Sequence, residues 1–493
     1  MKKATFKTIH TLVVLFALSC CFSCSRTPTA NLGRIYDIAA MKSDLYRNPV
    51  IVIPGVLGTH LKDKETEKVI WGAYSGDYAN PKNKKDLRLI ALPMEKNTPL
   101  KDLKDNIYAS GVLDTVKVSL FGLPFQFDAY MNILGSLGVG GYRDQSLGDS
   151  GAVQYGDDHF TCFQFPYDWR RDNVENAKHL HEFIKEKRKY IQKEYEKRFG
   201  VKDYDFKFDI VAHSMGGLIT RYYLRYGDKD LPTDGSEPEV TWEGARHIDK
   251  AILIGTPSAG AVKGFKVLVD GVSYSYFLPN YPSGLLGTMP GLYQIIPRPR
   301  HKTVRYKNDP NQILDLYDVE TWEKNNWGLL DPKQDKILQT LLPDVTDLNS
   351  RRSIAKDHLG KILKRTKRFY SALDTPAKRP NGLGMYLFAG DAFNTPKHLE
   401  VDPDNGRVHT SGKTHGDGLV SRNSSLMDES LGLNEEIKIK SPIDWSGVTF
   451  IFSDHIGLTK DPIFVDNLLY LLLHKNSQVS FNEESIKHES LKH

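Results

Sequence analysis

Phe208-Asp209-Ile210-Val211-Ala212-His213-Ser214-Met215-Gly216-Gly217 is the stretch of sequence that decides the fold. It starts as an apolar run typical of a buried strand (206–211), and after Ser214 it passes through glycines into a helical pattern (215–226). A strand, a serine flanked by small residues and a helix indicate a nucleophile elbow, here of the form A-x-S-x-G. The five-residue pattern alone is weak, and a helix N-cap serine is the alternative explanation. Its place between a buried strand and a helix makes Ser214 the candidate nucleophile.

The segments on either side of this stretch alternate between strand and helix patterns. Apolar, β-branched runs predict strands at 49–55, 160–165, 250–254, 385–389 and 448–451. Amphipathic or apolar patterns predict helices from Asn173 to about Gly200 and over 463–473. Strand and helix in alternation are typical of an α/β protein with a mostly parallel sheet and helices on both faces.

The domain organisation follows from two long interruptions of that alternation, at about 60–150 and about 258–380. Insertions of this length within one sheet usually cover a site. The 493 residues could make up three domains by size alone. We expect instead one α/β domain over 48–475 that carries a lid (about 60–150) and a cap (about 258–380), with a polar tail at 476–493.

The amino-terminal segment resembles a bacterial export signal. It has a basic start with Lys2, Lys3 and Lys7, then an apolar run at 12–18, then Cys20 after a small residue. This order predicts a lipoprotein signal peptide (1–19), lipidation at Cys20 and a tether (20–47), with Cys24 as the alternative anchor and an ordinary cleaved signal as the alternative reading. We therefore expect a lipid-anchored protein of the bacterial cell envelope, on the periplasmic or outer-membrane surface.

The composition limits the classes of partner. Hydrophobic residues make up 40% and charged residues 26% of the chain, as in a globular protein, and the net charge of +5 gives no argument for nucleic acid. Beyond the amino-terminal segment Cys162 is the only cysteine, so internal disulfides are not expected. No His, Cys and Asp cluster has metal-ligand spacing, so we expect neither a metal nor a cofactor.

The partners of Ser214 should follow it in the chain, because on this fold the order is serine, acid, histidine. His455 fits, since it lies in a loop after a predicted strand, whereas His213 should point away from Ser214 and His415 precedes one acid candidate. Two acids fit, Asp391 directly after a strand and Asp417 between two glycines. For the oxyanion, the candidate donors are the backbone N–H of Met215 and that of Val56 or Leu57.

Seven blocks, in this order, resemble the lecithin–cholesterol acyltransferase and lysosomal phospholipase A family of α/β-hydrolases. They are PVIVIPGVLG (49–58), FPYDWR (165–170), AHSMGG (212–217), IGTP (254–257), MPGLYQIIP (289–297), GDGLV (416–420) and His455. The resemblance implies an α/β-hydrolase fold with lid and cap insertions. It also implies a triad of Ser214, Asp417 and His455, with Val56 and Met215 as oxyanion donors, and so favours Asp417 over Asp391.

The chain departs from this family in its lid. In vertebrate members a disulfide fixes the lid, whereas residues 60–130 of this chain contain no cysteine. Trp71 remains a candidate contact for an acyl chain or the lid. In the acid block, Leu419 stands where threonine is common in the family. We expect Asp168 and Trp169 to have structural roles.

The function implied by the resemblance is a serine-dependent lipid acyl hydrolase or acyltransferase. It would act on glycerophospholipid esters through an acyl-serine, with water, a sterol or another lipid alcohol as acceptor. The alternative is a surface-displayed lipid-binding lipoprotein that keeps the fold without activity.

Overall fold

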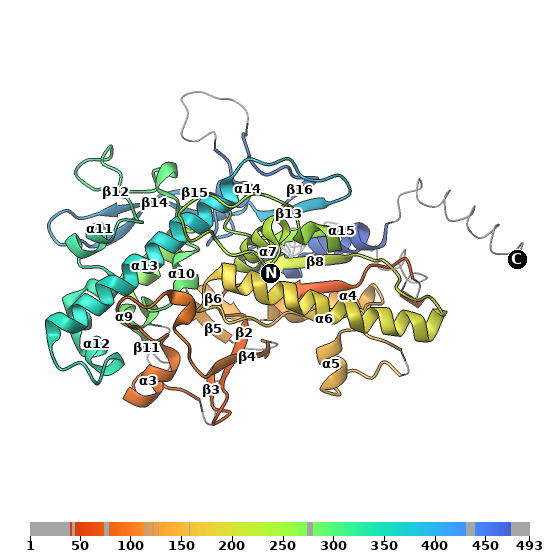
Figure 1. Cartoon of the computed structure of the whole chain (residues 1–493). Coiled ribbons are helices and arrows are strands. Elements are labelled where there is room, and N and C mark those ends of the chain that lie inside the picture. The colour runs from red at the N-terminus through yellow and green to blue at the C-terminus, as the bar shows by residue number, and fades with distance from the viewer. Residues whose placement is uncertain are drawn as a thin grey trace, which may run out of the picture.

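The computed structural model describes residues 40–41, 45–72, 78–113, 117–120, 123–126, 128–156, 158–273, 280–429 and 439–474 (Figure 1). The predicted signal peptide, both candidate lipidation sites, Cys20 and Cys24, and the polar tail lie outside the described residues.

The core is a sheet of six strands in the order β16-β13-β9-β8-β1-β7, and each neighbouring pair is parallel. The strands are β1 (Val50–Ile53), β7 (Cys162–Gln164), β8 (Phe208–His213), β9 (Ile248–Ile254), β13 (Gly384–Gly390) and β16 (Gly447–Ile451). The four residues of β1 have no exposed surface, as expected for a strand with helices over both faces. The predicted α/β-hydrolase fold class is confirmed.

The helices that flank the sheet include α4 (Asp128–Val139), α6 (Asn173–Phe199), α7 (Met215–Tyr226) and α15 (Pro462–Leu473). Every residue of α7 is buried. The side chain of Asp172 caps the start of α6 by accepting from the N–H of Val174, and Gly200, with φ 72°, ends that helix in the left-handed region. In Figure 1 the long helix α13 (Leu348–Asp374) runs diagonally away from this core.

Further α-helices and strands, together with the 3₁₀ helix η1, belong to the connections between the core strands. Before β7 they are β2 (Thr59–Asp63), β3 (Val69–Trp71), α3 (Lys84–Ile90), the 3₁₀ helix η1 (Leu100–Asp102), β4 (Ile107–Val112), β5 (Lys117–Leu120), β6 (Leu123–Gln126) and α5 (Gln145–Asp149). After β9 they are α8 (Val262–Asp270), β10 (Val272–Ser273), β11 (Asn280–Tyr281), α9 (Ser283–Leu286), α10 (Pro290–Tyr293), β12 (Val304–Tyr306), α11 (Val319–Lys324), α12 (Asp335–Leu341), β14 (Phe393–Val401), β15 (Val408–Gly416) and α14 (Arg422–Leu426). The segments predicted as lid (about 60–150) and cap (about 258–380) thus contain further strands and helices, whereas β14, β15 and α14 lie between β13 and β16.

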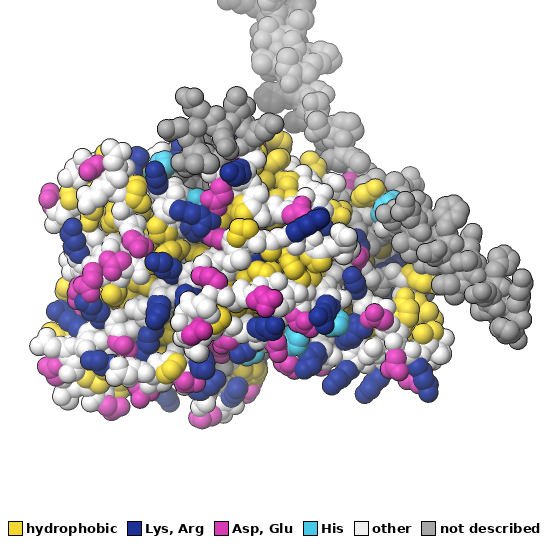
Figure 2. Space-filling view, turned by 45° about the horizontal axis from the view of Figure 1, so that its top comes forward, with side chains coloured by type: hydrophobic (Ala, Val, Ile, Leu, Met, Phe, Trp, Pro, Cys, Tyr) yellow, Lys and Arg dark blue, Asp and Glu magenta, His cyan; other side chains and the backbone are white. Residues whose placement is uncertain are grey.

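Both signs of charge are interspersed over the molecular face shown in Figure 2, with apolar atoms between them. This mixture agrees with the small net charge of the chain.

Candidate active site

Ser214 occupies a strained turn between β8 and α7. Its φ of 53° and ψ of −122° are unusual for a residue with a side chain, and such backbone geometry costs about 1–3 kcal/mol. Its N–H donates to the carbonyl of Ile254 at 2.8 Å, which ties the turn to the neighbouring strand β9. The serine is therefore held at the carboxyl end of the sheet, as an elbow requires.

Glycines give this turn its space. A Cβ on Gly55 would lie 2.8 Å from the Cβ of Ser214, and one on Gly216 would lie 2.5 Å from the carbonyl oxygen of Pro54. A side chain at either place would force the loop after β1 away from the serine. The two loops meet closely because both carry glycine at the contact.

His455 lies against Ser214 from the loop that follows β16. Its Nε2 is 3.1 Å from Ser214 Oγ, and its Nδ1 is 2.7 Å from Asp417 Oδ2. The histidine is buried, and its ring passes beside Gly255, where a Cβ would come within 3.1 Å of the imidazole. Because a carboxylate only accepts, Nδ1 carries the proton and Nε2 is left free to accept from the serine hydroxyl.

Asp417 is fully buried in the turn that follows β15. Its Oδ1 accepts from the N–H groups of Leu419 at 2.9 Å and Val420 at 2.7 Å, so the carboxylate is anchored on the side away from His455. Gly418, with φ 87°, provides the left-handed residue that this turn requires. The N–H of His455 also donates to the carbonyl of Asp417 at 3.0 Å.

Asp391, the other acid candidate, forms an ion pair with Arg422 at 3.2 Å instead. It follows β13 directly, but the β14–β15 hairpin returns the chain to the same end of that strand. Asp417 then packs on Gly390, where a Cβ would lie 2.5 Å from the Cβ of Asp417. The hairpin therefore places Asp417, and not Asp391, beside the histidine. His415, in β15, lies opposite Asn394 of β14.

The candidate oxyanion donors lie next to the serine. Within the described part of the chain, the N–H groups of Val56 and Met215 donate no hydrogen bond to the protein. Met215 N–H is also at the positive end of α7. Leu57, with φ 66°, turns the loop, and its carbonyl accepts the indole N–H of Trp71 at 2.8 Å.

Trp71 is buried and lies edge-on to Trp169, with ring centroids 5.4 Å apart. Trp71 thus lies behind the loop that follows β1 and carries the candidate oxyanion donor Val56 (residues 54–58, the oxyanion loop below), and a contact with an acyl chain stays a prediction. Asp168 pairs with Arg170, whose guanidinium is fully buried. Asp168 therefore contacts a buried arginine and Trp169 contacts Trp71, as expected for residues with a structural role.

Tyr130 and His213 form a second buried chain of contacts that the sequence analysis missed. The Tyr130 hydroxyl accepts the N–H of Gly55 at 2.7 Å and lies 3.4 Å from Nδ1 of His213. Nε2 of His213 lies 3.1 Å from the carbonyl oxygen of His455, so Nε2 carries the proton and donates. The chain joins the oxyanion loop to the backbone of the catalytic candidate His455.

Burial sets the protonation of this chain. It lowers the pKa of His213 to about 3, with the neighbouring His455 as a smaller cause, and it raises the pKa of Tyr130 well above its usual range. His213 is therefore neutral near pH 7. Its position next to Ser214 could have pointed to this role, whereas nothing in the local sequence marks Tyr130.

Two structural features are absent from the described residues. No group of three or more His, Cys, Asp or Glu side chains is arranged to hold a metal ion. Within the same residues no helix has both the length and the apolar character needed to cross a bilayer.

Comparison with known proteins gives one family match. Residues 151–287 match the model of the lecithin:cholesterol acyltransferase family. This segment includes the elbow and the block 254–257, and it confirms the resemblance expected from the sequence. It supports an ester hydrolase or acyltransferase that acts on lipid acyl groups. No curated protein sequence matches the chain significantly.

Comparison with solved structures gives matches of low identity that cover most of this chain. A chain of the Tle4-Tli4 complex is 15% identical with a TM-score of 0.53, and the match covers 86% of this chain and 98% of that one. EstA from Clostridium botulinum is 15% identical with a TM-score of 0.31, covering 90% and 92%. Mature lipase BlEst2 from Bacillus licheniformis is 11% identical with a TM-score of 0.28, covering 88% and 94%. The first likeness supports the fold.

Proposed function

From the match of residues 151–287 to the lecithin:cholesterol acyltransferase family, we propose that this chain is a serine-dependent acyl hydrolase or acyltransferase of glycerophospholipid esters. The observation that carries the proposal is the hydrogen-bonded series from Ser214 Oγ to His455 at 3.1 Å and from His455 to Asp417 at 2.7 Å. A serine hydroxyl becomes a competent nucleophile when a base takes its proton and an acid orients that base.

The first half of the reaction forms an acyl-serine. Ser214 Oγ attacks the ester carbonyl carbon while its proton passes to Nε2 of His455. The carbonyl oxygen becomes an oxyanion, which the N–H groups of Val56 and Met215 stabilise. When the tetrahedral intermediate collapses, the bond to the lysophospholipid oxygen breaks, and that oxygen takes the proton from His455 Nε2.

The second half transfers the acyl group. Water or a lipid alcohol gives its proton to His455 Nε2 as its oxygen attacks the acyl-serine, and Ser214 leaves with that proton. Asp417 accepts the Nδ1–H throughout and stabilises the imidazolium that forms in each half. Water yields a fatty acid, whereas a sterol or another lipid alcohol yields a new ester.

The test is the Ser214→Ala variant on a phospholipid labelled in its acyl chain. We expect turnover to fall by ~10⁴–10⁶-fold with the fold retained, as for removal of a triad nucleophile. A fluorophosphonate probe should label the wild-type protein on Ser214 and leave the variant unlabelled. Activity within tenfold of wild type would rule out the serine mechanism, and a folded wild-type protein that takes no label would favour a lipid-binding protein without activity.

Analysis of the products separates hydrolase from transferase. Labelled phospholipid is incubated with and without a sterol or long-chain alcohol, and the products are separated. A labelled fatty acid in both reactions indicates a hydrolase, and a labelled ester that appears only with the alcohol indicates an acyltransferase.

We further propose a lipid anchor at Cys20 that holds the enzyme at the surface of a bacterial envelope membrane. The support is the basic start, the apolar run and the small residue before Cys20. Mass spectrometry of the mature amino terminus tests this, since lipidation at Cys24 would move the site and an unmodified terminus would remove the claim. Cys20→Ser should shift the protein from the detergent to the aqueous phase without changing activity on soluble short-chain esters.

A further inference from the structure

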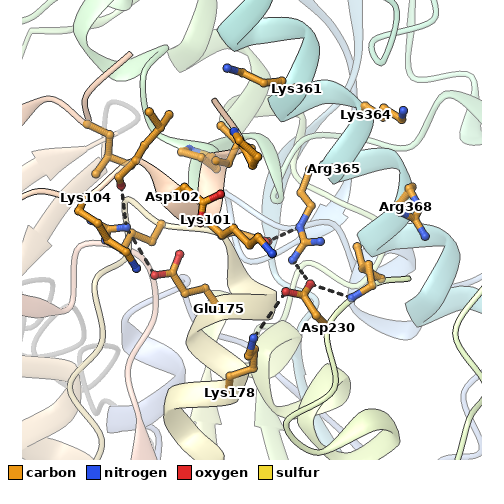
Figure 3. A pocket seen from close by; sticks show the side chains of 18 of the residues that line it. Lys101, Asp102, Lys104, Glu175, Lys178, Asp230, Lys361, Lys364, Arg365 and Arg368 are labelled. Carbon is orange, nitrogen blue, oxygen red and sulfur yellow. Dashed lines mark hydrogen bonds and ion pairs between the residues drawn. The ribbon is translucent and has the colours of Figure 1, made fainter. Parts of the chain in front are cut away.

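A cavity of about 730 Å³ lies outside the candidate active site, and none of the three triad candidates lines it. It is bordered by η1, by the start of α6, by α13 and by the segment 228–233 that follows α7 (Figure 3). Its volume is in the range of small-molecule sites, about 300–1,000 Å³. Nothing in the chemistry proposed above uses it.

Part of the cavity wall is apolar. Pro93, Pro99 and Leu100 contribute side chains that are partly or fully exposed, and the buried Leu92, Leu103 and Leu231 lie among them. Such a surface gains free energy when an alkyl chain covers it, because apolar area leaves water on both sides of the contact. The wall therefore fits a hydrocarbon chain.

A second part of the wall is cationic. Lys361, Lys364, Arg365 and Arg368 line the cavity from α13, and their spacing of three, four and seven residues puts them on one face of that helix. Figure 3 shows them along α13, with Lys101 and Lys104 projecting from another part of the wall. Positive side chains thus border the cavity from more than one element.

The acidic residues of the wall compensate some of these cations. Arg365 pairs with Asp172 and Asp230, and Lys178 lies 3.5 Å from Asp230. The other pairs at the wall are Arg171 with Glu175, Asp105 and Asp168, Glu182 with Lys185, and Lys361 with Asp357. Asp102 and Asp228 are acidic and have no such pair among the described residues.

Four cations of the wall form no ion pair within the described part of the chain, although Lys104 is near enough to Glu175, and Arg368 to Asp234, to act on the pKa of those carboxyls. Lys101, Lys104 and Lys364 form no ion pair there, and Arg368 donates only to the carbonyl of Ser236, at 2.8 Å. Lys364 and Arg368 are also four residues apart on one helix, where like charges repel. An anion between these side chains would relieve that repulsion, and the four cations outnumber the two aspartates that have no ion pair.

We propose that this cavity binds a single-chain anionic amphiphile, with its chain on the leucine and proline wall and its head group among Lys101, Lys104, Lys364 and Arg368. Fatty acids and lysophospholipids share this chemistry: one alkyl chain and a carboxylate or phosphate head. The proposal does not depend on the serine mechanism, because neither the wall nor the head-group site contains a triad residue.

The test measures binding of decanoate and of decyl phosphate to the full chain by titration calorimetry. Neither probe is an ester, so the proposed reaction cannot consume it, and protein labelled beforehand with a fluorophosphonate keeps the probes away from Ser214. Decanol tests the need for charge, and acetate and inorganic phosphate test the need for a chain. Preference for decanoate points to a fatty acid, and preference for decyl phosphate points to a phosphate-headed lipid.

Variants test whether the probes bind in this cavity. A triple variant should weaken binding of the two anionic probes by about tenfold or more, since each substitution removes one charge contact. Its substitutions are Lys101→Gln, Lys104→Gln and Lys364→Gln. The matched control combines Lys189→Gln, Lys193→Gln and Lys367→Gln, which are exposed, lie on α6 and α13, and do not line the cavity. The control should bind as the wild type does.

Three results in the comparisons between variants and between probes would overturn the proposal. They are equal loss of affinity in the two triple variants, equal binding of decanol and decanoate, and binding of acetate or phosphate as tight as that of the amphiphiles. A wild-type protein that binds none of the probes would overturn it as well.

Discussion

His455 is held at both ring nitrogens and at its own backbone. Nδ1 donates to Asp417, Nε2 faces Ser214, the N–H donates to the Asp417 carbonyl, and the carbonyl accepts from His213. A ring fixed in this way keeps one tautomer and one orientation, which a general base needs before substrate arrives.

Asp417→Asn should therefore lower turnover strongly. The amide can donate to Nδ1 and so favour the wrong tautomer, which costs about 10⁴-fold in serine proteases. Asp391→Asn is the control, because it removes only an ion pair with Arg422 and should change turnover by less than about tenfold. Steady-state kinetics on a soluble ester measures both, and the reverse ranking would assign the acid to Asp391.

Tyr130→Phe tests the contact between Tyr130 and the oxyanion loop. The variant leaves the buried N–H of Gly55 without its acceptor, at a cost of about 1–3 kcal/mol that would loosen the adjacent Val56. We expect kcat to fall by about tenfold while KM changes little, because the oxyanion forms only in the transition state.

Tyr223→Phe is the matched control for that experiment. The Tyr223 hydroxyl is buried in α7 and has no hydrogen-bond partner among the described residues, so its removal should leave kcat unchanged. A similar fall in both variants would show that Tyr130 acts through general stability alone.

At the scale of elements, the contact between α7 and its neighbours depends on glycine. A Cβ on Gly217 would lie 2.0 Å from Oγ1 of Thr256, in the loop after β9. No rotation of the fully buried Thr256 side chain can remove the whole overlap, since its Cβ would also be only 2.9 Å away. The helix can approach the strands closely because this position lacks a side chain.

Gly217→Ala should lower the free energy of unfolding by about 1–3 kcal/mol through overpacking. Thr256→Ala should restore part of that loss in the double variant, because it removes the overlapping atoms. Gly360→Ala is the control: it lies within α13 with nothing within 4 Å, so the variant should gain about 0.5–1 kcal/mol from helix propensity. Denaturant unfolding measures all three, and additive single effects would exclude the overlap as the cause.

For the whole molecule, Asp209 couples stability to pH from the end of the sheet opposite Ser214. Its carboxyl is fully buried near the start of β8, 3.3 Å from the amide of Asn48 and 3.6 Å from Lys250 Nζ. Burial raises the pKa of Asp209 from 3.8 to about 7, with the cation of Lys250 acting in the opposite direction. Between about pH 4 and pH 7, Asp209 thus keeps a proton in the folded chain that it has lost in the unfolded chain.

The contribution of Asp209 to the free energy of unfolding should therefore fall as the pH rises from about 4 to about 7, by at most about 1.4 kcal/mol per pH unit, and then level off. Asp209→Asn should remove this dependence, which unfolding at pH 5 and pH 8 would measure. Asp404→Asn, at an exposed turn, should keep it. Equal pH dependence in wild type and Asp209→Asn would contradict the assignment.

The order of the core elements was predictable, because it depends on local patterns. Continuous apolar runs such as 50–53 form buried strands wherever the chain packs them, and α6 begins at Asn173 and ends before Gly200 as its periodicity predicts. The elbow could also be recognised, since a strained turn at Ser214 requires small residues beside it in the sequence. The sequence by itself therefore determined the fold class and the candidate nucleophile.

Only the tertiary structure decided which distant residues meet. Sequence position favoured Asp391 and the family resemblance favoured Asp417, and the return of the β14–β15 hairpin places Asp417 against His455. Tyr130 reaches Gly55 from 75 residues away, and cations of η1 and α13 border one cavity. These contacts depend on how whole helices and strands pack against one another. The local sequence pattern of one element does not specify which other element will pack against it.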